Sequence, residues 1–290
     1  MKRWTRWAPV GALGAVALLV AGCGSSSGSQ NPGKAIQRAA YVSSSAAGYK
    51  VSLHLTEGDA ALGGSITGGG SGSFNLPKRA GSMTLALNLP GSLASAGTLH
   101  VQEILLGQDI YVKLPAQIAS HLPGHRPWLE INLAQVGKAA GIQNLTSLFG
   151  GSGSTNPGQF LDYLRATSSG GVTRVGSATV DGVQTTEYRA KIDLLKAPAA
   201  APAAQRTALR QAVSSLEKLT GLRTIPVDVW VDSANLVRRI TMSYSVNASG
   251  QSVHTQMQLD FLAYGSQPVP AAPPASQVTN ASSMLAAHTS

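Results

Sequence analysis

The stretch Thr224–Asp232 reads TIPVDVWVD, in which aliphatic side chains alternate with polar or aromatic ones. Successive side chains of a strand point to opposite faces of a sheet, so this alternation predicts a strand with one face covered and the other wet. A shift of one residue would exchange the two faces. We expect the covered face to hold Val227, Val229 and Val231, and the wet face to hold Asp228, Trp230 and Asp232.

The segments on either side of this stretch show the same alternation. Those predicted as strands are, in chain order, residues 172–180, Val183–Asp193, residues 236–246 and Gln251–Tyr264. Asp181-Gly182 separates the first two, and an Asp-Gly pair between alternating runs is typical of a tight hairpin. Such short links between consecutive strands indicate antiparallel pairing.

The N-terminal half of the chain contains shorter alternating segments. They predict strands at residues 51–56, 83–89, 99–106, 109–114 and 127–133. Residues 107–108 join two of these strands tightly. The glycine-rich residues 63–72 are predicted as a loose connection between strands.

Helices are predicted at four places. Residues 35–47 have a helix-permissive composition, residues 133–140 give a helical turn or two, and Asn156-Pro157 starts a helix after the Gly/Ser break at residues 150–154. A longer helix starts at Pro202 and ends at Gly221, with an apolar stripe along one side. The sequence thus predicts an α+β fold in which an antiparallel sheet of about ten or eleven strands has one face covered by helices.

The first residues form a separate pattern. Lys2, Arg3 and Arg6 precede an uncharged apolar run of about 14 residues, and a basic start followed by a short apolar run is typical of an export signal. A membrane-spanning helix needs roughly 20 apolar residues, so this run is short for a permanent anchor. We expect residues 1–22 to be a signal peptide that is removed.

Cys23 follows the small pair Ala21-Gly22, an arrangement that resembles the lipobox of bacterial lipoproteins. The resemblance implies cleavage before Cys23 and a diacylglycerol on its sulfur, whose thiolate is a suitable nucleophile. Cys23 is the only cysteine, so a disulfide framework is excluded; the alternative is a chance cysteine at the end of a secretory signal. We expect this lipid to hold the protein on the extracytoplasmic side of the cell membrane, with residues 23–34 as a flexible tether.

The charge of the chain is positive but dilute. The formal net charge of +9 falls to about +6 after residues 1–22 are removed, because that segment holds three basic residues and no acidic one. No run of Lys or Arg is present, so a nucleic-acid surface is not indicated. Weak attraction to anionic lipid head groups fits this charge, and so does an ordinary solvated surface.

A succession of strand sequences resembles a known family. These sequences are Asp109-Ile110-Tyr111-Val112-Lys113-Leu114, Trp128-Leu129-Glu130-Ile131-Asn132-Leu133, Val180-Asp181-Gly182 with Thr185-Thr186-Glu187-Tyr188, and residues 226–239. Together with the order of elements over residues 35–264, they look like the LppX/LprG family of actinobacterial lipoproteins and, more distantly, the LolA/LolB carriers. The resemblance implies a strongly curved sheet, a half barrel, with helices laid across its concave face.

The resemblance also implies a function, because proteins of that family bind or carry lipids and glycolipids in an apolar cavity between sheet and helices. The side chains that would line such a cavity here are Leu85, Leu87, Ile110, Val112, Phe160, Leu164, Leu209, Val213, Leu216, Val227, Val229, Val231, Met242, Tyr244, Met257, Leu259 and Phe261. Alternation alone does not separate a cavity wall from a packed core, since both are apolar. A structural or partner-binding envelope lipoprotein with a solid core is therefore the alternative.

Each candidate catalytic motif in the sequence lacks a residue or a structural context that its chemistry requires. Residues 28–34 have the spacing of a phosphate-binding loop, but Ala35 stands where Ser or Thr would bind magnesium. Ser215 and Lys218 have S-x-x-K spacing without its companion motifs. His121 and His125 lie four apart, with a Pro-Gly pair between them that breaks a helix. We predict no catalytic residue, no metal site and no cofactor.

Charged residues near Trp230 are predicted to be solvated. Asp228 and Asp232 lie about 13 Å apart along a strand, which is too far for the carboxylate pair of a glycosidase. Arg238-Arg239 is expected to take one of these carboxylates in a surface ion pair, with phosphate binding as the alternative. The expected organisation is a domain over residues 35–265, followed by a Pro/Ala/Ser-rich tail over residues 266–290 that is predicted to be disordered.

Overall fold

The protein is described by a computed structural model over residues 31–59, 63–120, 123–135, 158–167, 171–200, 203, 206–248 and 251–281. The strands are β1 (Gly48–Asp59), β2 (Gly64–Asn75), β3 (Ala80–Asn88), β4 (Thr98–Leu106), β5 (Asp109–Lys113), β6 (Trp128–Asn132), β7 (Thr173–Val180), β8 (Val183–Asp193), β9 (Thr224–Asp232), β10 (Val237–Ala248), β11 (Gln251–Tyr264) and β12 (Val278–Asn280). The helices are α1 (Pro32–Ser44), α2 (Ala116–Ala119), α5 (Gly158–Tyr163), α6 (Ala197–Ala200) and α7 (Arg206–Thr220). Short 3-10 turns occupy Gly91–Ala96, Pro123–His125, Leu164–Ala166 and Ala275–Gln277.

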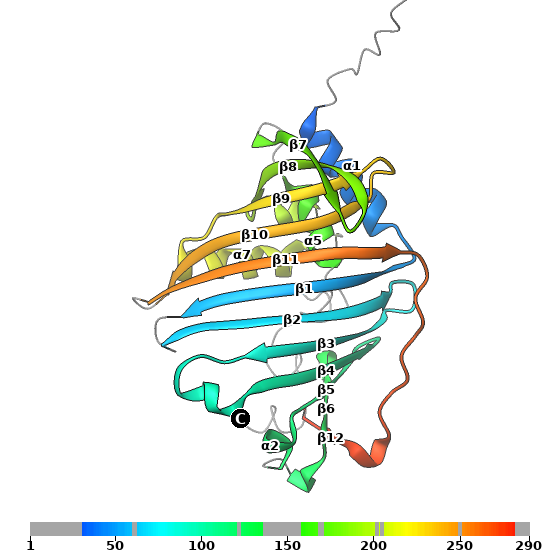
Figure 1. The fold of residues 1–290 in the computed structure, drawn as a ribbon, viewed down its shortest axis with the longest axis vertical. Helices are drawn as coiled ribbons and strands as arrows, with labels where there is room; N and C mark the ends of the chain where they lie inside the picture. Colours follow the sequence, from blue (N-terminus) through cyan, green and yellow to red (C-terminus); the bar gives the residue numbers. More distant parts are fainter. Residues whose placement is uncertain are drawn as a thin grey trace, which may run out of the picture. The chain divides into compact units, whose positions relative to one another are not determined.

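All of these strands belong to one open, curved sheet. Its strand order is β12-β6-β5-β4-β3-β2-β1-β11-β10-β9-β8-β7, so β1 joins an N-terminal run of strands to a C-terminal one (Figure 1). Neighbouring strands pair antiparallel, except that β12 runs parallel to β6. Helices α5 and α7 lie behind the sheet in Figure 1. The predicted α+β class with a curved, mostly antiparallel sheet is confirmed. The sheet contains two strands, β2 and β12, that were not among the individual strands predicted from the sequence.

The first additional strand is β2, and the prediction of a loose connection over residues 63–72 is wrong. The glycines leave no side-chain alternation to read, yet β2 pairs with β1 along its whole length and with β3 from Thr67 to Asn75. At Gly70, an added Cβ would lie 2.6 Å from Leu85 Cδ2 and 2.3 Å from the carbonyl oxygen of Thr84. Leu85 of the neighbouring strand thus covers the glycine backbone in the middle of β2, where β2 has no apolar side chains of its own.

The second additional strand is β12, and the prediction of a disordered tail is wrong over residues 266–281. The backbone of this segment has partners: Asn75 Nδ2 donates to the carbonyl oxygen of Gln267 at 2.5 Å, and an Arg126 guanidinium nitrogen donates to that of Val278 at 2.6 Å. The amide of Ala281 donates to the carbonyl oxygen of Glu130 at 2.8 Å. These hydrogen bonds attach the proline-rich segment to the domain and give partners to its backbone groups. Its composition alone does not predict them. Residues 282–290 lie outside the described residues.

Helix α1 begins at Pro32, three residues before the predicted start and inside the predicted tether. Asn31 caps it, because its side-chain oxygen accepts from the amides of Gly33 at 3.0 Å and Lys34 at 3.4 Å. Proline at the first position is compatible with a helix because its missing amide hydrogen would be unpaired there anyway. The predicted tether can therefore extend only to residue 30, and residues 1–30 lie outside the described residues.

Several local predictions are confirmed. Asp181 and Gly182 both have positive φ, at 48° and 79°, as the tight hairpin between β7 and β8 requires. Helix α7 ends where predicted, and the amide of Gly221 donates to the carbonyl oxygen of Glu217 at 2.8 Å. The predicted helices at residues 133–140 and after Asn156 are described only at residues 133–135 and in α5; the Gly/Ser break at residues 150–154 and Pro202 lie outside the described residues.

Candidate functional site

The face of the sheet that packs against the helices, called the covered face here, holds the apolar side chains of the long strands. Val227, Val229 and Val231 of β9 are 2%, 0% and 6% exposed. The predicted register of β9 is therefore confirmed for the valines. Because register determines which face every neighbouring side chain occupies, the covered face can be followed from strand to strand through the pairing.

Many predicted cavity residues lie in one packed core on this face. The core combines side chains from α1, α5 and α7 with those of strands β1–β3 and β8–β11. Its buried members from the predicted set are Leu164, Val213, Val227, Val229, Val231, Met242, Leu259 and Phe261. These side chains contact one another at no more than 7% exposure, so here the alternative of a solid core is the better description.

Other predicted cavity residues lie around this core. Leu85, Phe160, Leu209 and Met257 are half-buried and pack against its edge, and Leu87 and Tyr244 are also half-buried. Ile110 and Val112 belong instead to a second, smaller cluster with Leu105, Ile131 and Leu133. The side chain of Leu216 lies outside the described residues. The predicted set is thus divided among a core, its edge and a separate cluster.

A strip of half-buried side chains crosses strands β11, β1 and β3 on the covered face. In the pairing, Met257 lies opposite Leu55, and Leu53 lies one step further along β1. On the other side of β2, whose glycines separate the two strands, Leu87 of β3 lies in register with Leu55, and Leu85 lies in register with Leu53. We call these residues, Leu53, Leu55, Leu85, Leu87 and Met257, the apolar strip. All five are partly exposed, unlike the core residues beside them.

A pocket of about 180 Å³ lies beside the core, where α1 and α5 meet strands β1–β4. Its apolar lining includes Tyr49, Phe74, Leu105 and Leu161, each at most 3% exposed. The ring of Tyr49 lies 5.5 Å from that of Phe74, and its hydroxyl accepts from the amide of Gly158 at 2.8 Å. Burial raises the pKa of Tyr49 well above its ordinary value, so the hydroxyl stays neutral.

Polar residues share the lining of this pocket: Ser44, Asn75, Arg79 and Asp162. Half of the Asp162 side chain is exposed, and Arg165 lies 3.7 Å from its carboxylate. Desolvation by the surrounding elements raises the pKa of Asp162, against the opposite effect of Arg165. Sequence reasoning missed the lining residues. Tyr49 continues the alternation of Val51, Leu53 and Leu55 by one step, so this pattern could have placed it on the covered face. No sequence pattern points to Arg79.

The opposite face of the sheet carries polar side chains and an open groove of about 360 Å³ across β9, β10, β11 and β1. The residues around it include Asp228, Thr241, Gln258 and His54, which alternate with the covered-face residues. At one end, Arg189 contacts Asp228 at 2.8 Å and 3.3 Å. Asp228 therefore lies on the predicted wet face and is paired there.

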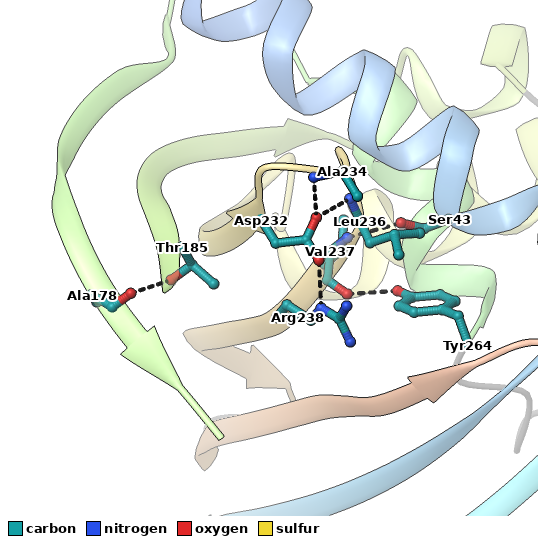
Figure 2. Close-up of polar contacts among 9 residues, drawn as sticks. All are labelled: Ser43, Ala178, Thr185, Asp232, Ala234, Leu236, Val237, Arg238 and Tyr264. Carbon is teal, nitrogen blue, oxygen red and sulfur yellow. Dashed lines mark hydrogen bonds and ion pairs between the residues drawn. The ribbon is translucent and has the colours of Figure 1, made fainter. Parts of the chain in front are cut away.

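Asp232 corrects the prediction for the end of β9, because it is buried rather than wet. One carboxylate oxygen accepts from the amides of Ala234 and Leu236, each at 2.9 Å, and so closes the turn to β10 (Figure 2). The other oxygen accepts from Arg238 Nε at 2.7 Å, which makes the predicted ion pair largely buried. Arg239 pairs elsewhere, with Asp260, and its guanidinium lies over the ring of Trp230.

A short chain of hydrogen bonds connects this turn to α1. The amide of Val237 donates to Ser43 Oγ at 2.9 Å, and the carbonyl oxygen of Val237 accepts from the Tyr264 hydroxyl at 2.6 Å (Figure 2). Burial raises the pKa of Tyr264 far above its ordinary value. The end of the first helix is thus attached to the sheet through two buried residues, Ser43 and Val237, which fixes α1 beside the core.

Among the residues that the structure describes, no three or more His, Cys, Asp or Glu side chains gather as a metal site would require. His125 Nδ1 lies 2.5 Å from the carbonyl oxygen of Ser120, and His121 is outside the described ranges. No described helix is long and apolar enough to cross a membrane.

The chain matches no family model and no protein with a curated description. Among solved structures, it is similar to the lipoprotein LppX of Mycobacterium tuberculosis, with 14% identity and a TM-score of 0.43 over 82% of this chain and 96% of that one. LprF from Mycobacterium bovis gives 13% identity and a TM-score of 0.42 over 84% and 96%. A further match is an outer membrane lipoprotein-sorting domain from Vibrio parahaemolyticus, with 8% identity and a TM-score of 0.26 over 81% and 92%.

Proposed function

We propose that this protein is an extracytoplasmic lipoprotein, anchored to the cell membrane by diacylglycerol on Cys23. The support is the order of the N-terminal sequence, in which a basic start, a short apolar run and the pair Ala21-Gly22 precede the only cysteine. Two acyl chains on one residue give stable anchoring, whereas a single chain binds membranes only marginally.

We further propose that the domain binds or carries a lipid or glycolipid through its acyl chains, between the sheet and the helices. One observation carries this proposal: the covered face does not end at its packed core but continues in the apolar strip, where five large apolar side chains remain partly exposed. Each methylene buried there contributes about 0.8 kcal/mol to binding. The length of the lipid's acyl chains should therefore affect affinity more than those parts of its head group that do not contact the protein.

A second candidate is a structural or partner-binding envelope lipoprotein without a ligand. The observation that favours it is the solid core around Val229, Ile240 and Leu259, each of which is at most 1% exposed. In this alternative the apolar strip is covered by a protein partner rather than by lipid. The two candidates differ in whether lipid accompanies the isolated domain.

Native mass spectrometry of the domain without its lipid anchor, purified from its own host, tests the lipid proposal. The expected result is co-purifying lipid that is lost in Met257→Trp, because indole would fill space at the strip. Leu262→Trp is the matched control, since Leu262 lies on the same strand, is 47% exposed and is not part of the covered-face core. The control should keep the lipid.

Other results would favour the alternative. An apo mass for the wild-type domain, with no uptake of added lipid, would support the structural or partner-binding candidate. Equal lipid occupancy in wild type, Met257→Trp and Leu262→Trp would show that lipid does not bind at the apolar strip.

A further inference from the structure

The pocket beside α5 is amphiphilic, which distinguishes it from the apolar strip. Its inner lining is made of Tyr49, Phe74 and Leu161, all nearly free of water contact. Its remaining lining includes polar and charged groups, among them Arg79 of the turn between β2 and β3. A site with this division suits a molecule that has an apolar part and a polar part.

Most polar groups of the lining are already engaged within the protein. Asn75 donates to Gln267 and accepts from the amide of Lys78 at 3.1 Å. Ser44 Oγ accepts from Arg165 at 2.5 Å, and Arg165 also lies near Asp162. The negative charge of Asp162 is therefore partly offset by a neighbouring cation.

Arg79 differs from them. Its backbone is fixed on both sides, because its amide donates to Leu76 at 3.0 Å and its carbonyl oxygen accepts from Gly107 at 2.9 Å. Its side chain is exposed, and within the part of the chain that the structure describes its guanidinium has no hydrogen bond or ion pair. Lys78, also exposed, precedes it in the same turn. This turn therefore presents uncompensated positive charge at the pocket.

We propose that Arg79 binds the anionic head group, phosphate or carboxylate, of an amphiphile whose aliphatic chain enters this pocket. The proposal rests on the proposed lipid-binding function and adds the charge class of the ligand. A guanidinium presents parallel donors that match the oxygens of phosphate and carboxylate, and such charge-assisted bonds are stronger than neutral ones. The pocket, at about 180 Å³, is smaller than typical sites for drug-sized ligands, so it would take the part of a chain next to the head group.

The test compares two lipids that share their acyl chains. The full chain, purified in detergent, is titrated with dioleoyl phosphatidylglycerol or dioleoyl phosphatidylcholine in mixed micelles, and native mass spectrometry reports occupancy. We expect the wild type to prefer the anionic lipid by about tenfold. Arg79→Gln should remove this preference and leave binding of the zwitterionic lipid unchanged. Arg174→Gln is the charge-matched control, because Arg174 is exposed on β7 and does not line the pocket.

Arg79→Gly provides a second variant. Arg79 has φ of 49°, a left-handed conformation that glycine adopts without strain, so this exchange removes the side chain without stressing the turn. Retention of the preference in both Arg79 variants, or equal loss of both lipids, would overturn the proposal while the lipid-binding function stands. If the wild type binds neither lipid, the proposed function itself fails and this inference fails with it.

Discussion

The guanidinium of Arg238 lies 2.7 Å from the carboxylate of Asp232, with side-chain exposures of only 19% and 5%. The same carboxylate accepts two backbone amides of the turn between β9 and β10. A buried charge that loses its partner carries a large desolvation penalty. Asp232 is therefore both the closing element of the turn and the counter-ion that lets Arg238 lie beside the ring of Tyr264.

Removal of the Asp232 carboxylate should strongly destabilise the domain. For Asp232→Ala we expect the free energy of unfolding to fall by about 3–5 kcal/mol, because Arg238 is left largely buried without its counter-ion. Asp228→Ala is the matched control: it breaks the ion pair with Arg189, whose side chain is 63% exposed, and should cost only about 0–1 kcal/mol. Urea denaturation of both variants measures the difference, and equal losses would contradict the assigned role of Asp232.

Tyr49, which is buried, and Tyr264, which is partly buried, should make the stability of the fold sensitive to alkali. Burial raises the pKa of Tyr49 and of Tyr264 above the ordinary value of 10.0. Above that value the unfolded chain loses these protons while the folded chain keeps them, so stability is present below about pH 10 and falls as the pH rises further. The fall should reach about 1.4 kcal/mol per pH unit for each tyrosine.

Tyr49→Phe tests this relation, because it keeps the packed ring and removes the ionisable hydroxyl. Its unfolding free energy, measured from pH 8 to pH 11, should decline less steeply than that of the wild type. The matched control is Tyr41→Phe on α1, since Tyr41 is 63% exposed. Parallel pH curves for wild type and Tyr49→Phe would show that Tyr49 does not contribute to the alkaline loss.

The glycines of β2 should resist replacement on the covered face. Gly70→Val places side-chain atoms against Leu85 and the backbone of Thr84, and we expect a loss of about 1–3 kcal/mol or more from overpacking. Gly176→Val on β7 is the control, because nothing lies within 4 Å of an added Cβ there. Thermal denaturation should show a lower midpoint for Gly70→Val alone; similar midpoints would mean that Leu85 does not need the glycine.

Long alternating segments made most of the sheet predictable. β8, β9 and β11 have the predicted bounds because apolar and polar side chains alternate along much of each strand. β2 could not be predicted in this way, since glycines have no side chain and its apolar cover comes from β3. The tail escaped prediction for a related reason: its order depends on hydrogen bonds from Asn75 and Arg126, which lie far away in the sequence.

The candidate site was less predictable than the sheet. Apolar alternation identified Val229 and Met257 equally, although one is fully buried in the core and the other lies partly exposed in the apolar strip. Exposure depends on which helix covers which strand, and the sequence of a single strand does not contain that information. Asp232 shows the same limit, because strand alternation places it on the wet face while the following turn draws its carboxylate inward.

The final prediction concerns Cys23 and the attachment of the protein to the membrane. Cells that make the wild-type chain and are fed radiolabelled palmitate should label it, because the diacylglycerol is expected on this sulfur. Cys23→Ala should remain unlabelled and leave the membrane fraction, since no other cysteine is present to replace it. Met257→Trp is the matched control for altered lipid binding: it should be labelled and membrane-bound like the wild type, because the anchor is covalent and separate from the apolar strip. Equal labelling of the wild type and Cys23→Ala would contradict the lipoprotein assignment, whatever the domain binds.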